Sequence, residues 1–197
     1  MMPRADRNAP GRPGWGYQAA RTATGTPAMA EHEGVDAEEF KSTFRHHPAG
    51  VAVVTADDGA GPAGLTATSV VAVSAEPALL AFSLTSASTT APRVLGARTA
   101  VVHLLGAGEV GLARRFATGG IDRFADPGSW TRLPTGEPLL REVTVWLRCR
   151  IAQRLTAGDS TLVLGEVLGT HQNTSDRCPL VYQNRTFYVL GESAVVT

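Results

Sequence analysis

Hydroxyl side chains gather in the segment Gly64-Leu65-Thr66-Ala67-Thr68-Ser69, which lies between two apolar stretches. Hydroxyls and exposed backbone N–H groups can bond the carbonyls and ring nitrogens of a flat heterocycle. Small side chains also let the backbone approach the face of such a ring. The candidate binding residues here are Thr66, Ala67, Thr68 and Ser69. The alternative is an ordinary edge strand, because threonine favours sheets, and composition alone favours that alternative.

A second group of hydroxyls precedes a predicted helix. It contains Ser83, Thr85, Ser86, Ser88, Thr89 and Thr90. Because a helix N-terminus offers free N–H groups and the positive end of the helix dipole, this place is suited to a phosphate. A solvated Ser/Thr loop with a helix cap explains the same residues equally well.

Arginine is the third candidate group. Arg114, Arg115 and Arg123 lie near Phe116 and Phe124 in the sequence, and a guanidinium gives planar, bidentate contacts to phosphate. The alternative is that Arg114 and Arg115 are solvated helix residues, and we favour it for at least one of them.

Gly106-Ala107-Gly108-Glu109-Val110-Gly111 is a literal G-x-G-x-x-G, and Asp126 follows it by about 20 residues. A dinucleotide-binding Rossmann unit would also need a longer helix and a parallel strand ending at the acidic residue. Asp126 instead lies in an Asp-Pro-Gly turn, and the flanking segments indicate hairpins. We therefore keep the Rossmann fold only as a minor alternative.

Histidine and cysteine show no metal-ligand spacing, so we predict no structural metal. Cys149 and Cys178 form no CxxC pair and no disulfide framework, which favours a reducing cytoplasm. His47, His103 and His171 are expected to be structural or solvated. No catalytic side chain is predicted.

Composition indicates one globular domain with tails. The chain has 197 residues, 43% of them apolar, and its 18 Lys and Arg balance its 18 Asp and Glu. This balance argues against nucleic-acid and anionic-membrane partners. No apolar run approaches the roughly 20 residues that span a bilayer, and no secretory signal is evident. We expect a disordered tail over residues 1–34, a domain over 35–192 and a C-terminal tail over 193–197.

The domain is predicted to be rich in short strands. A helix begins after the N-cap Asp36 and ends at Pro48. Further short helices are expected at 89–96 and 109–117, and an irregular segment at 119–138. Strands are expected at 51–55, 64–68, 70–74, 79–84, 99–105, 144–155, 161–171, 181–182 and 186–190. Many short strands with few helices favour a mainly β barrel or sandwich.

The order and spacing of several motifs together resemble the flavin reductase family. The resemblance covers about Glu39 to Gly191. The motifs are Phe44-Arg45, Gly50-Val51-Ala52-Val53-Val54-Thr55, Gly64-Leu65-Thr66-Ala67-Thr68-Ser69, Val73-Ser74-Ala75-Glu76-Pro77, Arg114-Arg115-Phe116-Ala117, Asp122-Arg123-Phe124, Gly136-Glu137-Pro138-Leu139-Leu140, Trp146-Leu147-Arg148-Cys149-Arg150, Gly158-Asp159, Gly165-Glu166-Val167 and Pro179-Leu180-Val181-Tyr182.

The resemblance implies an FMN-binding split β-barrel of Greek-key-like topology. It further implies a homodimer that passes a hydride from NADH or NADPH to FMN or FAD, and a partner monooxygenase that receives the reduced flavin. By analogy, the flavin contacts would be Thr66, Ala67, Thr68, Ser69, Ser83, Ser88 and Thr89, with Arg123 and Phe124 near the cofactor.

Two positions depart from the family pattern. Thr68 stands where Asn is frequent, and Ser160 follows Gly158-Asp159 where His is frequent. Because of these departures, we assign no specific residue to positioning the hydride. A non-catalytic flavin- or haem-binding split barrel is the alternative function.

Overall fold

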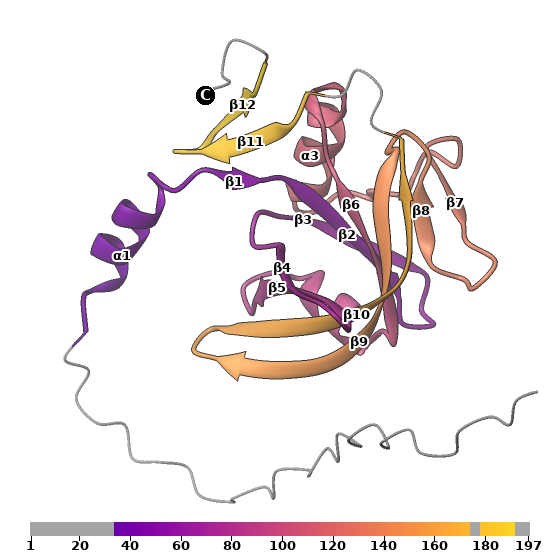
Figure 1. Ribbon diagram of the computed structural model, residues 1–197, viewed down its shortest axis with the longest axis horizontal. Helices are drawn as coiled ribbons and strands as arrows, with labels where there is room; N and C mark the ends of the chain where they lie inside the picture. Colours follow the sequence, from indigo (N-terminus) through magenta and orange to yellow (C-terminus); the bar gives the residue numbers. More distant parts are fainter. Residues whose placement is uncertain (1–33, 174–177, 192–197) are drawn as a thin grey trace, which may run out of the picture. The chain divides into compact units, whose positions relative to one another are not determined.

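A seven-stranded antiparallel sheet forms the centre of the fold (Figure 1). The computed structural model describes residues 34–173 and 178–191, so the predicted tails lie outside the described residues, apart from Gly34. The strands lie in the order β3-β2-β6-β9-β10-β5-β4, and each neighbouring pair is antiparallel. Their bounds are β2 Ala52–Asp57, β3 Pro62–Ala67, β4 Val71–Ala75, β5 Ala78–Thr85, β6 Thr99–Leu104, β9 Val145–Ala157 and β10 Ser160–Gln172.

The two longest strands curl this sheet. Strands β9 and β10 have 13 residues each, and their pairing shifts register between Leu164 and Gly165 and again between Val167 and Gly169. Such bulges bend a strand and increase its twist. Figure 1 shows both strands curving beneath and beside the others. The sheet therefore closes only in part, and β3 and β4 remain as its two edges.

Two small sheets accompany the central one in the described part of the chain. One contains β1 Ala49–Gly50, β11 Leu180–Gln183 and β12 Thr186–Val189. The other is a hairpin of β7 Trp130–Arg132 and β8 Pro138–Leu140. This hairpin corrects the irregular segment predicted for 119–138. Its strands have only three residues each, too few to show an alternating pattern, and Gly136 makes the turn with a φ of 103°.

The described residues form three short α-helices beside the sheets. Helix α1 spans Ala37–Phe44, and the carboxylate of its N-cap Asp36 accepts bonds from the N–H groups of Glu38 and Glu39. Helix α2 spans Ala91–Gly96. A 3-10 turn, η1 Ala107–Glu109, leads into α3 Val110–Ala117. Among the described residues, no helix is both long enough and apolar enough to cross a membrane.

The hydrophobic core has two parts. Val54, Phe82, Val102 and Val163 belong to the cluster enclosed by the curled sheet. The second cluster joins β2 and the β11–β12 hairpin to α3, with Phe116 and Leu180 among its members. Apolar side chains on the two faces of the strands thus pack into these two clusters. As a result, β3 lies between the barrel interior and α3.

The glycine-rich segment before α3 is no dinucleotide fingerprint. The strand that precedes it, β6, pairs antiparallel with both β2 and β9, so the parallel βαβ crossover of a Rossmann unit is missing there. The Glu109 carboxylate accepts a bond from the N–H of Gly106 and closes the turn. A Cβ added at Gly108 or Gly111 would meet no atom within 4 Å, so neither glycine serves a close approach.

Candidate functional site

The two edges of the central sheet are consecutive strands, β3 and β4, joined by the loop Thr68–Val70. The Ser69 hydroxyl in this loop donates to the carbonyl of Ser83 on β5 at 3.2 Å. It also accepts a bond from the Ser83 N–H at 2.9 Å. Ser69 therefore ties the end of β3 to β5 and brings two of the predicted site residues together.

The outer edge of β3 offers backbone groups to a ligand. The carbonyl of Gly64 faces away from β2, because it accepts a bond from Arg123 Nη1 at 3.1 Å. Backbone groups two residues apart on a strand face the same side, so the N–H and carbonyl of Thr66 also face this open edge. The Thr66 hydroxyl donates to the carbonyl of Ala113 in α3 at 2.7 Å, which holds the strand under the helix.

Side chains of β3 alternate between the core and the site. Ala67 is 6% exposed and belongs to the barrel core, and its backbone groups point toward β2, on the side opposite those of Thr66. Thr66 is partly exposed and Thr68 is exposed, on the opposite face of the strand. In the predicted segment, Ala67 is therefore buried and anchors the strand, whereas Thr66 and Thr68 are accessible to a ligand.

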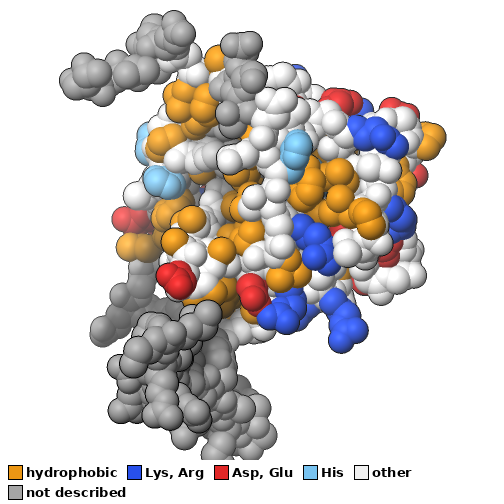
Figure 2. Space-filling model, turned by 45° about the vertical axis from the view of Figure 1, so that its right-hand side comes forward, with side chains coloured by type: hydrophobic (Ala, Val, Ile, Leu, Met, Phe, Trp, Pro, Cys, Tyr) orange, Lys and Arg blue, Asp and Glu red, His pale blue; other side chains and the backbone are white. Residues whose placement is uncertain are grey.

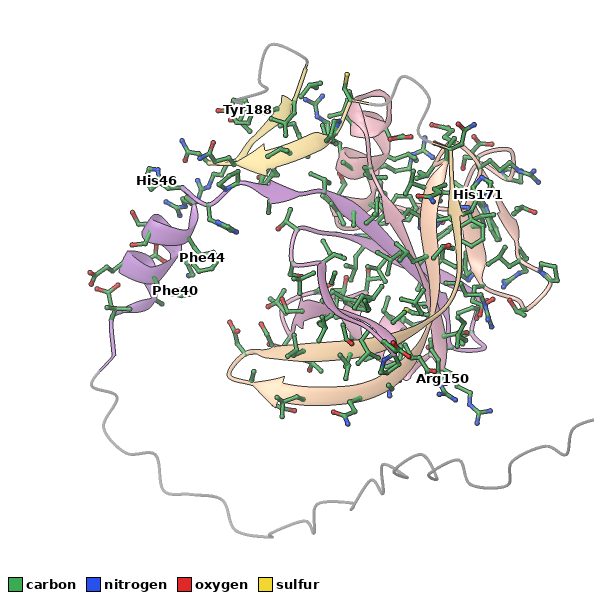
Figure 3. All side chains as sticks on the ribbon, in the orientation of Figure 1. Phe40, Phe44, His46, Arg150, His171 and Tyr188 are labelled. Atoms are coloured by element: carbon green, nitrogen blue, oxygen red, sulfur yellow. The ribbon has the colours of Figure 1, made fainter. Side chains whose placement is uncertain are left out.

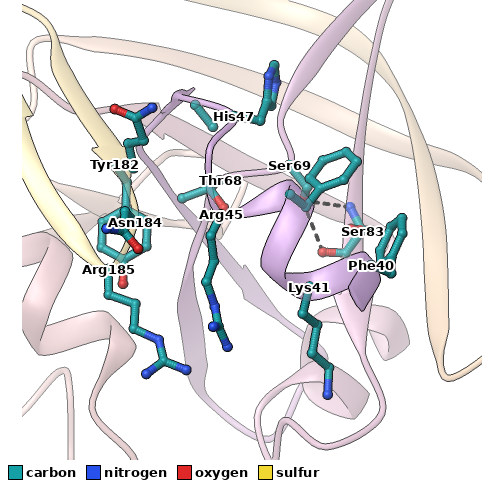
Figure 4. A pocket seen from close by; sticks show the side chains of 13 residues that line it. Phe40, Lys41, Arg45, His47, Thr68, Ser69, Ser83, Tyr182, Asn184 and Arg185 are labelled. Carbon is teal, nitrogen blue, oxygen red and sulfur yellow. Dashed lines mark hydrogen bonds between the residues drawn. The ribbon is translucent and has the colours of Figure 1, made fainter. Parts of the chain in front are cut away.

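Two cavities meet beside these hydroxyls. The first, of about 520 Å³, lies between α1 and the predicted residues Thr68, Ser69 and Ser83 (Figure 4). The second, of about 590 Å³, is lined by Thr66, Thr68, Arg114, Ala117, Thr118, Tyr182, Arg185 and Phe187. Both volumes lie in the range of small-molecule sites. Thr68, Tyr182 and Arg185 line both cavities and mark their junction.

The loop before α2, which contains Ser88 and Thr89, is separate from the two cavities beside β3. The Ser88 hydroxyl accepts bonds from the N–H groups of Thr90 and Ala91, so it caps the turn that leads into the helix. Thr89 is exposed. Neither Ser88 nor Thr89 lines the two cavities beside β3. The helix has only six residues, which limits the dipole available for a phosphate.

Arg123 holds this loop against β3. Its guanidinium donates to the carbonyls of Gly64 and Thr118 and to the hydroxyl of Thr90. Burial lowers the pKa of Arg123 from its usual value. Because these protein oxygens occupy its donors, Arg123 positions the loop and β3 rather than projecting freely toward a ligand.

Phe124 lies in the hydrophobic core instead of a cavity. It is 9% exposed, and its ring makes edge contacts at 5.3 Å between centroids with both Phe116 and Trp130. The neighbouring residues Arg123 and Phe124 thus point to different surroundings, which their adjacency in the sequence does not reveal. We do not keep Phe124 among the proposed ligand contacts.

The other candidate arginines have different surroundings. The Arg114 guanidinium lies 5.9 Å from the centroid of the Phe187 ring and lines the second cavity. Arg115 Nη1 donates to the Ser129 hydroxyl at 3.5 Å, away from both cavities. Arg114 is exposed, as expected of a solvated helix residue, and it also lines the second cavity, whereas Arg115 is half-buried.

The histidines are structural or exposed, as predicted. His103 is fully buried, its Nε2 accepts a bond from the Leu140 N–H, and its Nδ1–H therefore donates to the Val53 carbonyl. Burial lowers the pKa of His103 to about 4, so the ring is neutral. His47 and His171 are exposed. Among the described residues, no group of three or more His, Cys, Asp or Glu is arranged to hold a metal.

The hairpin tip that departs from the family pattern lies beside β5. Ser160 pairs with Thr85, and its hydroxyl donates to the Asp159 carboxylate at 3.0 Å. The Asp159 carbonyl accepts a bond from the N–H of Ser86. The tip thus contacts the Ser/Thr loop without lining either cavity beside β3.

Residues outside the predicted set complete the two cavities. They include Lys41 and Arg45 of the α1 segment and Tyr182, Arg185 and Phe187 of the β11–β12 hairpin. Two hydrogen bonds bring these segments together: the N–H of Asn184 donates to the Arg45 carbonyl at 2.9 Å, and Gln183 Nε2 donates to the His46 carbonyl at 2.7 Å. No local sequence pattern signals a contact between segments this far apart.

This arrangement fits a flavin. An open strand edge supplies backbone groups, hydroxyls lie on the same face, and two adjoining cavities could take a flat ring and a second substrate. Comparison with known families agrees, because the family described as "Flavin reductase like domain" matches residues 44–191. The chain belongs to the flavin reductase family.

Individual members of the family are similar to this chain in sequence and in structure. An NADH:FMN oxidoreductase of Rhodococcus qingshengii is 41% identical over 166 residues, which cover 83% of this chain and 85% of that protein. A crystal structure of a flavin reductase domain protein from Arthrobacter sp. FB24 superposes with a TM-score of 0.73 at 33% identity, covering 78% of this chain and 95% of that one.

A third relative is the flavin reductase component of a bacterial two-component tryptophan halogenase. It superposes with a TM-score of 0.71 at 27% identity and covers 80% of this chain and 99% of that one. The fold class predicted from the sequence, a mainly β split barrel with a few short helices, is confirmed by these likenesses.

Proposed function

We propose that the protein is an NAD(P)H:flavin oxidoreductase that passes a hydride from a reduced nicotinamide to FMN or FAD. The observation that carries this proposal is the open edge of β3, where Thr66 lines the second cavity and Thr68 lines both cavities. Two adjoining spaces suit two ring systems that must meet for a hydride to move. The names of the relatives, which include NADH, FMN and flavin reductase, support the same reaction.

The residues at the site would bind and orient. The backbone of Thr66 and Thr68 supplies donors along the ring edge, Ala67 anchors the strand in the core, and Ser69 and Ser83 hold the floor of the first cavity. Ser88 and Thr89 shape the loop that Arg123 fixes against β3. A bound flavin supplies the redox chemistry itself. Fixed backbone donors are suited to stabilise negative charge that develops on a ring, without an acid or base from the protein.

The proposal includes a homodimer. Helix α1 has no buried residue, and its Phe40 and Phe44 are 54% and 59% exposed with ring centroids 5.2 Å apart. Figure 3 shows both rings projecting from the helix on one side. Further exposed hydrophobic side chains are visible in Figure 2, and Val71 and Val73 of β4 are among those exposed in the structure. A second copy would remove these groups from water.

The reduced flavin would pass to a separate monooxygenase. The relative that serves a two-component halogenase supports this role. Thr68 and Ser83 are both exposed, so a ligand bound there can leave without unfolding of the barrel. We place the reaction in the cytoplasm, because both cysteines are free thiols, as is usual in a reducing compartment.

The experiment that tests the proposal is a nicotinamide oxidation assay. Purified full-length protein is mixed with NADH or NADPH and with FMN, FAD or riboflavin in every combination. Consumption that requires both protein and flavin would support the proposal and identify both substrates. Binding of flavin without consumption of either nicotinamide would contradict it.

A further inference from the structure

The turn between β11 and β12 carries an arginine in an unfavourable backbone conformation. Asn184 and Arg185 have φ angles of 46° and 62°, so both turn residues are left-handed. Hairpins of this kind favour Asn-Gly, and a side chain larger than Asn in that conformation costs roughly 1 to 2 kcal/mol. The chain has Asn at the first position and Arg at the second, where glycine would remove the cost. Such an outlier raises the hypothesis that the guanidinium has a function.

The turn is held against the end of α1. The bonds from Asn184 and Gln183 to the carbonyls of Arg45 and His46 fix this contact. As a result, Arg45 and Arg185 both line the first cavity, and Figure 4 shows their side chains extending in the same direction. Two long cationic side chains from distant segments are therefore brought to one site.

Neither guanidinium is neutralised within the described chain. Four other arginines pair with carboxylates: Arg93 with Asp58, Arg132 with Asp57, Arg148 with Glu137 and Arg150 with Glu166. Arg45 and Arg185 form no ion pair with a described residue, and no described Asp or Glu lines either cavity.

Glu38, whose carboxylate is close enough to be influenced by both arginines, has a different ion-pair partner. Glu38 pairs with Lys41 at 2.9 Å. Lys41 lowers the pKa of Glu38 first, and Arg45 and Arg185 add smaller effects in the same direction. The region therefore holds an excess of positive charge at the mouth of the candidate site, which an anionic ligand would offset.

We propose that Arg45 and Arg185 form a phosphate-binding subsite at the junction of the two cavities. The proposal rests on the proposed function, which supplies two phosphate-bearing ligands: the nicotinamide dinucleotide and the phosphorylated flavin. Guanidinium groups bind phosphate through planar, paired donors. Arg185 lines both cavities, so a phosphate there lies between the spaces that would hold the rings. The subsite is distinct from the loop before α2, where the Ser88 hydroxyl already accepts bonds from the N–H groups of Thr90 and Ala91.

Direct binding of inorganic pyrophosphate tests the subsite without any catalytic readout. Calorimetric titration of the full-length protein should detect binding that weakens about tenfold or more in Arg185→Gly and in Arg45→Gln, as expected for loss of a charged hydrogen bond. Arg185→Gly also relieves the left-handed conformation, so its melting temperature should not fall. Arg185→Lys should retain part of the affinity, and Arg98→Gln, which removes an exposed charge elsewhere, should bind like the wild type.

Steady-state kinetics then assign the ligand. If the subsite holds the dinucleotide, Arg185→Gly raises the KM for NADH but not for N-benzyl dihydronicotinamide, which has no phosphate. If it holds the flavin phosphate, the variant raises the KM for FMN but not for riboflavin. Unchanged pyrophosphate binding, or equal effects on the phosphorylated and phosphate-free substrates, would overturn the subsite. A wild-type protein that binds pyrophosphate but oxidises no nicotinamide would refute only the proposed function.

Discussion

Ser69 and Ser83 are joined by two hydrogen bonds through one hydroxyl, which accepts from the Ser83 N–H and donates to the Ser83 carbonyl. This pair fixes the loop between the two edges of the sheet against β5. It also forms the floor of the first cavity, so the same bonds support the fold and the candidate site.

Replacing this hydroxyl should weaken flavin binding. Ser69→Ala leaves the polar groups of Ser83 without their partner, which costs about 1 kcal/mol at an exposed site. We expect a fall of a few degrees in melting temperature and a rise of about tenfold in the KM for FMN. Ser42→Ala, on the exposed surface of α1, is the control and should change neither quantity. Wild-type values for Ser69→Ala would show that the loop is held by other contacts.

Gly64 is predicted to tolerate no side chain. A Cβ there would lie 2.8 Å from Cε1 of Phe116 and 3.1 Å from Cγ2 of Thr55. Phe116 is buried, so β3 or the ring must shift, and Gly64→Ala should destabilise the protein by about 1 to 3 kcal/mol in chemical denaturation.

Gly108→Ala is the matched glycine control, because a Cβ there meets nothing within 4 Å. It should leave both stability and the KM for NADH close to the wild-type values. Loss of nicotinamide binding in Gly108→Ala would instead favour a dinucleotide site on the glycine-rich segment.

Buried His103 should make stability depend on pH. Burial lowers its pKa from 6.5 to about 4. Between these two pH values the histidine is protonated in the unfolded chain but neutral in the folded chain. The stability present above pH 6.5 should fall as the pH is lowered and be lost by about pH 4, in total by roughly 3 kcal/mol. His103→Gln can keep one or both hydrogen bonds without titrating. Unfolding free energies at several pH values should therefore fall less steeply for this variant, and parallel curves would refute the assignment.

The aromatic pair on α1 should hold the dimer together. Phe40→Ser with Phe44→Ser removes two exposed rings, so the circular dichroism spectrum should not change while the dimer dissociates at lower protein concentration. Sedimentation velocity measures the mass directly. Glu39→Gln, on the same helix, serves as the control. A wild-type protein that sediments as a monomer at every concentration would rule out the proposed dimer.

Most strands were predictable because their side chains alternate and strong turn residues separate them. Gly158-Asp159 marks the hairpin between β9 and β10, and the predicted turn across Asn184-Arg185 joins β11 and β12. The β7–β8 hairpin was missed because three residues per strand show no period.

The site was only partly predictable. Thr66, Thr68, Ser69 and Ser83 line the cavities, and their contact with a flavin stays a prediction. Arg45 and Arg185 were missed because long-range hydrogen bonds between α1 and the last hairpin bring them together. Phe124 was placed near the cofactor by analogy with the family motif Asp122-Arg123-Phe124, whereas its ring packs in the core. Local motifs thus identified the floor of the site but not the segments that close it.

The most direct test of the central claim is an anaerobic reaction in which nicotinamide oxidation and flavin reduction are followed together. The account predicts that the full-length protein accelerates both changes, with one flavin reduced for each nicotinamide oxidised. A protein that binds flavin but leaves both absorbance signals at the uncatalysed rate would contradict the reductase function and favour a binding protein with the same fold.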